Sequence, residues 1–247
     1  MKIKDIIFEA PLPQPAPSEV DQYKKLYGKY SNLGDMGLDD LDDYKQLGSG
    51  IEAKVVHDPR EPEVTKIVGS RQAIKQNAYM QYILLSRKYA NENPYLPRVE
   101  SIQKLGGGDN PYYDAKPDDA EGPVKEYYVI KLEKLTPLFK ASAGELEFIF
   151  NTMFYYGKEL DPPMPAPRFG DENDTKNHFF RAIEDFLVQS IEGENISRTD
   201  PRLKAVINLI RKLIKGGADN DLHSGNMMVR RTPHGAQLVI TDPLHTF

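Results

Sequence analysis

The chain has 247 residues, 39% of them hydrophobic and 28% charged, and its formal net charge is −5. This composition is typical of one large domain or two lobes with their own cores, and it offers no positive field for nucleic acid. Without cysteine, the chain cannot contain disulfides, thiolate zinc sites or a cysteine nucleophile. No run approaches the roughly 20 apolar residues of a membrane helix, and the N-terminus does not resemble a signal peptide.

Residues 1–43 are predicted to form an arm outside the compact part of the protein. Residues 10–19, APLPQPAPSE, are proline-rich and are expected to be extended. We favour a tether or packed arm over a binding peptide, and both interpretations are open. The acidic residues of 35–45 do not have the spacing of an EF-hand, which favours a solvated turn or a short helix.

Residues 44–135 are predicted to form a sheet with one helix. Five apolar or alternating stretches indicate strands, and a glycine turn, LGSG, joins the first two. The third strand is VTKIV, and the last two lie in RVESIQKL and EYYVIKLEKL. Residues 70–90 contain no glycine or proline and repeat apolar residues at helical spacing. A polar insertion at 106–123 separates the last two strands.

Residues 136–247 are predicted to be mainly helical. Ser142 and Glu145 have the spacing of a capping box at the start of the first helix. A second helix is expected at about 175–191. The third, within 200–217, is the clearest, because it begins with Asp-Pro and ends with Gly-Gly. Two short strands, NMMVRR and AQLVITD, then form a hairpin.

Three oxygen-bearing side chains lie near the end of the chain. Asp221 and Asn226 are in a loop behind the third helix, and Asp242 ends the second strand of the hairpin. If the hairpin closes, Asp242 returns towards Asn226. Carboxylate and amide oxygens suit magnesium, so Asn226 and Asp242 are predicted metal ligands, while Asp221 is left to orient or deprotonate a hydroxyl. Asp and Asn also build turns, but that explanation is weaker for all three residues together.

Two features of the first lobe suit phosphate. The glycines of LGSG let the backbone amides of Gly48, Ser49 and Gly50 approach an anion, although turns between strands often use glycine anyway. Lys66 stands inside an apolar strand, where its ammonium group needs a partner or a path to water. An edge lysine that reaches water and a lysine that binds phosphate are both open interpretations.

LGSG, HDP, VTKIVG, DLHSGN and ITDP together resemble motifs of the protein-kinase-like superfamily. DLHSGN is similar to the catalytic loop D-x-x-x-x-N, and to its D-L-H-x-G-N form in aminoglycoside phosphotransferases, while VITDP stands where kinases carry D-F-G. The combination is particularly similar to the serine/threonine kinase domain of short-tailed lytic phages, which phosphorylates host proteins. The resemblance covers about residues 44–247 and is most specific in the last 28.

The resemblance implies an α+β, bilobal fold, in which a small antiparallel N-lobe with one helix precedes a truncated, mainly helical C-lobe. It implies ATP and Mg²⁺ as cofactors and a Ser/Thr hydroxyl of a protein as the acceptor, with no nucleic-acid or membrane partner. The implied location is the cytoplasm, which is the host cytoplasm if the chain comes from a phage.

The resemblance also assigns roles to individual residues. The assigned residues are Gly48, Ser49, Gly50 and Lys66 for the phosphates, Glu133 to Leu135 as the hinge whose backbone meets adenine, Asp221 as the catalytic aspartate, and Asn226 and Asp242 as metal ligands. His223 is expected to orient the loop.

The sequence also departs from the kinase pattern. A kinase lysine normally pairs with a glutamate in the next helix, but residues 70–90 contain no Asp or Glu. Gln76 or Gln81 is expected to substitute through a weaker, neutral hydrogen bond to Lys66. Asn220 replaces an arginine, which argues against control by a phosphorylated activation loop. The chain also ends five residues after its last aspartate, before any activation segment.

Three functions are therefore open. We favour an active phosphotransferase, with a protein acceptor ahead of a small-molecule hydroxyl. The second is a nucleotide-binding pseudokinase that serves as an interaction module. The third is a phage structural or accessory protein that uses the fold without nucleotide.

Overall fold

The structure is a computed structural model that describes part of the chain: residues 12–14, 16, 17, 23, 45–49, 53–70, 76–106, 126–154, 171–193, 196 and 199–245. The predictions for the acidic stretch, most of the proline-rich arm, the polar insertion and Gly50 lie outside these residues. The chain divides into two compact units, each described by itself below. Unit 1 comprises Met1–Arg87, Arg98–Lys134 and Phe247, and unit 2 comprises Lys88–Pro97 and Leu135–Thr246. No described helix is long and apolar enough to cross a membrane.

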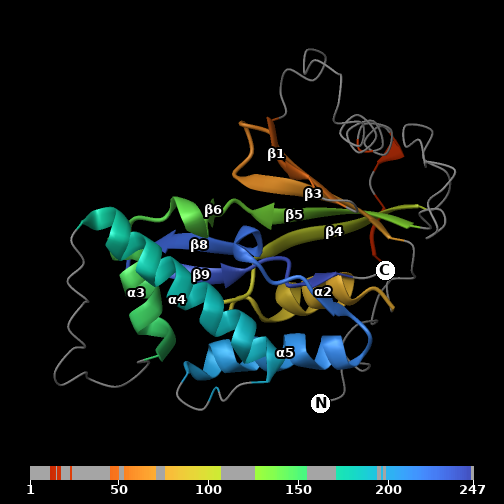
Figure 1. The fold of residues 1–247 in the computed structure, drawn as a ribbon. Coiled ribbons are helices and arrows are strands. Elements are labelled where there is room, and N and C mark those ends of the chain that lie inside the picture. The colour runs from red at the N-terminus through yellow and green to blue at the C-terminus, as the bar shows by residue number, and fades with distance from the viewer. Residues whose placement is uncertain are drawn as a thin grey trace, which may run out of the picture. The chain divides into compact units, whose positions relative to one another are not determined.

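Unit 1 is built on a five-stranded antiparallel sheet with the order β1-β2-β3-β5-β4 (Figure 1). Its strands are β1 (Lys45–Ser49), β2 (Ala53–His57), β3 (Glu63–Ser70), β4 (Val99–Gly106) and β5 (Glu126–Glu133). The central strand, β3, pairs with β5 along its whole length and is buried at every residue after Glu63. The five strands predicted from the sequence are confirmed.

The helix of unit 1, α2 (Ala78–Tyr89), begins later than predicted. β3 continues to Ser70, and Asn77 immediately precedes the helix. The Asn77 side chain accepts a hydrogen bond from the Met80 amide at 2.9 Å and donates one to Ser70 Oγ at 2.8 Å. Because such a cap satisfies an amide that has no partner within the helix, α2 starts here. The prediction of a helix from residue 70 is therefore wrong at its N-terminal end.

Unit 2 contains three described α-helices, and predicted capping signals mark the start of the first and both ends of the third. The three helices are α3 (Ala143–Phe154), α4 (Glu172–Glu192) and α5 (Pro201–Lys215). The second was expected at about 175–191 and begins earlier, at Glu172 behind an Asp171 cap. The capping box is confirmed: Ser142 N donates to Glu145 Oε2 at 2.9 Å, and Glu145 N donates to Ser142 Oγ at 3.3 Å. Asp200 caps α5 as predicted, by accepting a hydrogen bond from the Arg202 amide. α3 and α4 lie side by side (Figure 1).

The hairpin of unit 2 forms as predicted. Its strands β8 (Met227–Thr232) and β9 (Gly235–Ile240) are joined by β6 (Thr136–Pro137) in a three-stranded sheet, and β7 (Asp219–Asn220) pairs with β10 (Leu244–His245). The turn requires glycine at 235, because its φ is 120° and a Cβ there would lie 2.6 Å from the Phe148 ring. β9 ends at Ile240, so Asp242 follows the strand and does not end it.

Residues 88–97, which comprise the end of α2 and most of its connection to β4, belong to unit 2. The Tyr95 hydroxyl donates to Asp200 Oδ2 at 3.0 Å, and both residues are buried. The buried Arg230 guanidinium donates to two backbone carbonyls of this segment, at 2.8 and 3.0 Å. Polar contacts therefore bind this internal segment to the C-terminal half of the chain.

The fold is α+β, with a small antiparallel sheet in unit 1 and mainly helices in unit 2. This arrangement is compatible with the bilobal, kinase-like fold that the sequence resemblance implies.

Candidate functional site

The loop between β7 and β8 brings Asp221 and Asn226 together. Asn226 Nδ2 donates to the Asp221 backbone carbonyl at 2.7 Å and lies 3.3 Å from Asp221 Oδ2. Because the nitrogen of the carboxamide is committed to Asp221, its Oδ1 is the atom that remains to accept from or coordinate a ligand. Both side chains are half-buried, which leaves part of each within reach of solvent.

The closed hairpin returns Asp242 to this loop. Thr241 donates to the Asn226 carbonyl through both its amide, at 3.0 Å, and its hydroxyl, at 3.1 Å. On the other side of Asp242, the Pro243 carbonyl accepts from the Asp221 amide at 3.0 Å. Asp242 is therefore fixed between two residues that are bonded to Asn226 and Asp221. The expected return of the tail towards Asn226 is confirmed.

Backbone amides along the loop donate to acceptors of the protein itself. The bonds are Leu222 to the Asn220 side chain (3.1 Å), Ser224 to Glu184 Oε1 (3.0 Å), Gly225 to His223 Nδ1 (3.0 Å) and Asn226 to the His223 carbonyl (2.9 Å). The groups that the loop presents to a ligand are therefore side-chain oxygens more than N–H donors. Such a surface suits a cation or a hydroxyl group better than a bare anion.

His223 makes a contact that orients the loop. Its Nδ1 accepts the Gly225 amide, so a neutral ring carries its proton on Nε2. The ring also lies against Gly225, where an added Cβ would be 2.7 Å from its Cε1 atom. The glycine of the DLHSGN motif therefore makes room for the histidine of the same motif.

Glu184 of α4 is a site residue that the sequence analysis did not identify. Its carboxylate accepts the Ser224 amide, 40 residues further along the chain, in a charge-assisted hydrogen bond. This bond attaches the middle of the loop to α4. A carboxylate whose partner is a distant backbone amide leaves no spacing signal in the sequence. Glu184 differs from the exposed Asp185 beside it only in being half-buried on the amphipathic helix.

The oxygen atoms of this loop fit a hard cation. Asn226 Oδ1 and the Asp242 carboxylate are donors of the kind that Mg²⁺ takes, usually together with water and phosphate oxygens. Within the described ranges, no group of three or more His, Asp or Glu residues could hold a metal. A cation bound by these two oxygens alone would need further ligands, such as water.

Lys66 lies in the middle of β3, the central strand of the unit 1 sheet, and is only 6% exposed. In the ladder it is opposite Val55 of β2 and Ile130 of β5. The interpretation as an edge lysine is therefore wrong. Its Nζ lies 4.1 Å from the centre of the Tyr79 ring, which α2 supplies.

Tyr79 was not predicted as a partner of Lys66. Of the expected substitutes for a helix carboxylate, Gln76 is exposed and precedes α2, while Gln81 is half-buried within it. The aromatic ring is one contact of the ammonium group, and a substitution of Gln81 alone would not remove it. No spacing in the sequence marks this pair, because tertiary packing brings the first turn of the helix to the strand of Lys66.

The predicted phosphate loop and hinge are described only in part. Gly48 and Ser49 end β1, after an irregularity in its pairing with β2, and Gly50 lies outside the described residues. In the hinge, the Glu133 amide donates to the Arg98 carbonyl at 3.1 Å and is committed to the sheet. Leu135, the first residue of the second segment of unit 2, is half-buried. Their roles in nucleotide binding stay predictions.

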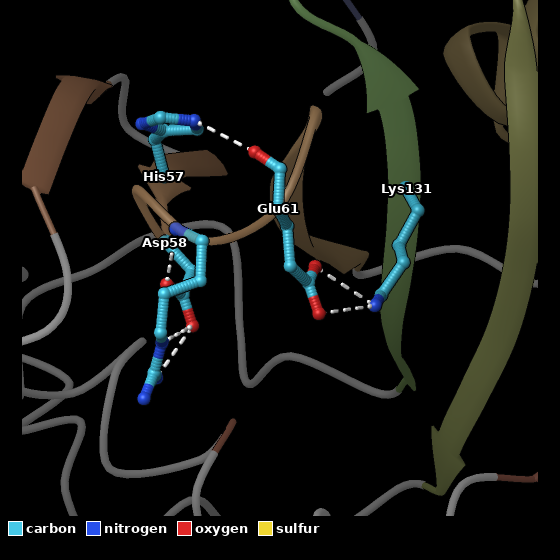
Figure 2. Close-up of polar contacts among 5 residues, drawn as sticks. His57, Asp58, Glu61 and Lys131 are labelled. Carbon is cyan, nitrogen blue, oxygen red and sulfur yellow. Dashed lines mark hydrogen bonds and ion pairs between the residues drawn. The ribbon is translucent and has the colours of Figure 1, made fainter.

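The HDP motif forms a polar turn between β2 and β3 (Figure 2). The His57 ring contacts the Glu61 carbonyl at 3.1 Å, and the Glu61 carboxylate contacts Lys131 Nζ at 3.0 Å. The Arg60 guanidinium, 2.7 Å from the Asp58 carboxylate, lowers the pKa of Asp58 to about 2. These groups satisfy one another within unit 1, which indicates that the motif stabilises the turn.

A family profile matches part of the chain. The family is described as Bacteriophage T7 protein kinase 0.7, and the match covers residues 164–246. The matched segment contains α4, α5, the loop with Asp221 and Asn226, and the hairpin that leads to Asp242. It is similar to a phage protein kinase. A comparison with curated proteins found no match. The profile match supports the phage-kinase resemblance and a kinase-like transferase function.

Proposed function

We propose that the protein is an ATP- and Mg²⁺-dependent phosphotransferase, which transfers the γ-phosphoryl group to a Ser or Thr hydroxyl of another protein. The observation that carries this proposal is the loop in unit 2, in which Asn226 and Asp242 are fixed beside Asp221. The similarity of residues 164–246 to a phage protein kinase supports the same activity.

Each residue has a separate task in the proposed reaction. Asp221 orients the acceptor hydroxyl and takes its proton as the hydroxyl oxygen bonds to the γ-phosphorus, while the bond from that phosphorus to the bridging oxygen breaks and ADP leaves. Asn226 Oδ1 and the Asp242 carboxylate would hold a Mg²⁺ ion, which would supply positive charge to the phosphates of the nucleotide. The Lys66 ammonium binds the α- and β-phosphates. Catalysis by such a site depends mainly on positioning and on charge stabilisation.

Two alternatives share the site. Transfer to a small-molecule hydroxyl is suggested by the DLHSGN form of the loop. A nucleotide-binding pseudokinase is suggested by α2, which brings Tyr79 to Lys66 in a helix whose sequence contains no carboxylate. The proposed residues do not distinguish these functions by themselves, because all three use the same oxygen donors.

The proposal is tested by incubating the purified full chain with labelled ATP and Mg²⁺, and with a bacterial lysate or a generic protein as acceptor. Transfer to protein is expected, together with its loss by at least about 100-fold in Asp221→Ala and in Asp242→Ala. Asp185→Ala is the matched control, because it removes an exposed carboxylate of α4 from the same unit. EDTA should abolish transfer, and excess Mg²⁺ should restore it.

The outcomes separate the alternatives. Nucleotide-dependent thermal stabilisation without transfer supports a pseudokinase, since a ligand of the folded state raises Tm. ATP turnover that requires an added aminoglycoside or another small alcohol, and not protein, supports the small-molecule acceptor. If the protein shows neither nucleotide binding nor turnover, the proposal is wrong.

A further inference from the structure

We propose that Tyr79 is the positioning residue of Lys66, and that its ring does the work of the helix carboxylate that other kinases pair with their lysine. The inference rests on the proposed function, because it takes nucleotide phosphate to be the ligand of Lys66. It explains how the site can operate although residues 70–90 contain no Asp or Glu.

The burial of Lys66 makes the ring contact energetically significant. Lys66 and Tyr79 are each only 6% exposed, and an ammonium group in such surroundings has lost most of its contact with water. An aromatic face within about 6 Å attracts a cation, most strongly when the pair is desolvated. The separation of 4.1 Å between Nζ and the ring centre is well inside that limit.

The position of the ring is fixed by the fold. Tyr79 is the second residue of α2, directly after the cap that Asn77 provides. Asn77 also donates to Ser70, which ends the strand that carries Lys66. Asn77 and Ser70 are almost fully buried, at 3% and 1% exposure. The start of α2 is thus bonded to the strand of Lys66, and the ring is placed over the ammonium before any ligand arrives.

A ring and a carboxylate have different consequences for phosphate binding. A carboxylate would add a negative charge beside the lysine and would accept hydrogen bonds from its N–H groups. The Tyr79 ring is neutral and attracts the whole cation, so it does not require any particular N–H donor. The charge of Lys66 is therefore not balanced by Tyr79. The pair of Lys66 and Tyr79 carries a net charge of +1, whereas a lysine–glutamate pair carries none.

Two variants of Tyr79 test this inference in the full chain. Tyr79→Phe keeps the ring face, whereas Tyr79→Leu removes it. The first measurement, made without nucleotide, is the rate at which an amine-acylating reagent modifies Lys66, read by mass spectrometry of its peptide. We expect the rate to rise about tenfold in Tyr79→Leu, because the ammonium form loses the attraction of the ring, and to stay within about twofold in Tyr79→Phe.

The second measurement is the ATP dependence of transfer. Tyr79→Leu should raise the KM for ATP about tenfold with a smaller change in kcat, and Tyr79→Phe should rescue the KM. Tyr82→Leu is the matched control, because it removes another fully buried ring of α2 and should leave the acylation rate of Lys66 within about twofold. If Tyr79→Leu does not fold, Tyr79→Met replaces it, since methionine fills the space without a ring.

The inference is overturned if Tyr79→Leu acylates like the wild type, if Tyr79→Phe and Tyr79→Leu behave alike, or if the Tyr82 control shows the same rise. Failure of the proposed function looks different. In that case the acylation rate of Lys66 still depends on the Tyr79 ring as expected. Added ATP, however, does not slow that acylation, and the protein does not turn ATP over.

Discussion

Lys66 in unit 1 and the Asp221–Asn226 loop in unit 2 are held in different ways. The loop is fixed by hydrogen bonds between atoms that are mostly close in sequence, such as the Asn226 carboxamide and the Asp221 carbonyl. Lys66 is held against a ring 13 residues away, on a different element. Polar turn chemistry leaves a spacing signal in the sequence, whereas packing of a cation on an aromatic face leaves none.

The cores of the two units also differ in the contacts that hold them together. Unit 2 uses buried polar groups to join distant segments, as in the Tyr95–Asp200 bond and the contacts of Arg230 with residues 94 and 96. Unit 1 relies on a long β3–β5 ladder, and its buried Asn77–Ser70 bond joins residues only seven positions apart. Substitutions of buried polar groups should therefore cost more free energy of unfolding in unit 2 than in unit 1.

The largest expected effect is that of Asp200→Ala. Asp200 is fully buried, caps α5, and binds both the Tyr95 hydroxyl and the Arg202 guanidinium. Removing it deletes the cap of α5 and two charge-assisted contacts of the buried carboxylate, so the free energy of unfolding should fall by about 3–5 kcal/mol. Urea denaturation followed by circular dichroism measures this. A loss below about 1 kcal/mol would show that unit 2 does not depend on its buried polar bonds.

Glu184→Ala should have the next largest effect, on rate more than on stability. Loss of the charge-assisted bond to the Ser224 amide loosens the loop, and we expect kcat to fall about tenfold with little change in the KM for ATP. Steady-state kinetics give both values. Glu184→Gln, which keeps an acceptor oxygen, should recover part of the rate, and Asp185→Ala should retain all of it. An unchanged kcat in Glu184→Ala would mean that the local bonds hold the loop unaided.

Asn77→Ala tests the strand–helix contact of unit 1. It removes the cap of α2 and the bond to Ser70, which should lower the free energy of unfolding by about 1–2 kcal/mol. Asn77→Asp keeps an acceptor for the Met80 amide and should recover most of the stability. Thermal denaturation of the three proteins provides the comparison. If Asn77→Ala loses as much free energy of unfolding as Asp200→Ala, the two units do not differ in their dependence on buried polar groups.

Glu145→Gln should have the smallest effect, and one that depends on pH. The Arg231 guanidinium, followed by the Ser142 amide, lowers the pKa of Glu145 from 4.5 to about 2. Because the folded pKa is the lower one, the carboxylate stabilises the fold at neutral pH, and this contribution is lost as pH falls from about 4.5 to about 2. Arg231 is largely exposed, so the contribution is only about 0.5–1 kcal/mol.

The wild type and Glu145→Gln should therefore differ in Tm at pH 7 and converge near pH 2. A difference that grows towards acid pH would reverse the sign of this prediction.

Much of the fold could be predicted because its signals are local. Strand alternation, the capping box at Ser142, the cap at Asp200 and the closed hairpin depend on residues near one another in the sequence. The start of α2 was wrong because the helical apolar spacing continued through residues that precede the Asn77 cap. Tyr79 and Glu184 could not be predicted, since their partners are chosen by tertiary packing, which has no period along the chain.

Because residues 88–97 belong to unit 2, the boundaries of recombinant fragments matter. The chain passes between the units at Arg87–Lys88, at Pro97–Arg98 and again at Lys134–Leu135. A recombinant fragment that begins at Leu135 would lack Tyr95, and so would leave Asp200 without its phenol partner. The C-terminal half of the chain alone therefore does not contain the whole of unit 2.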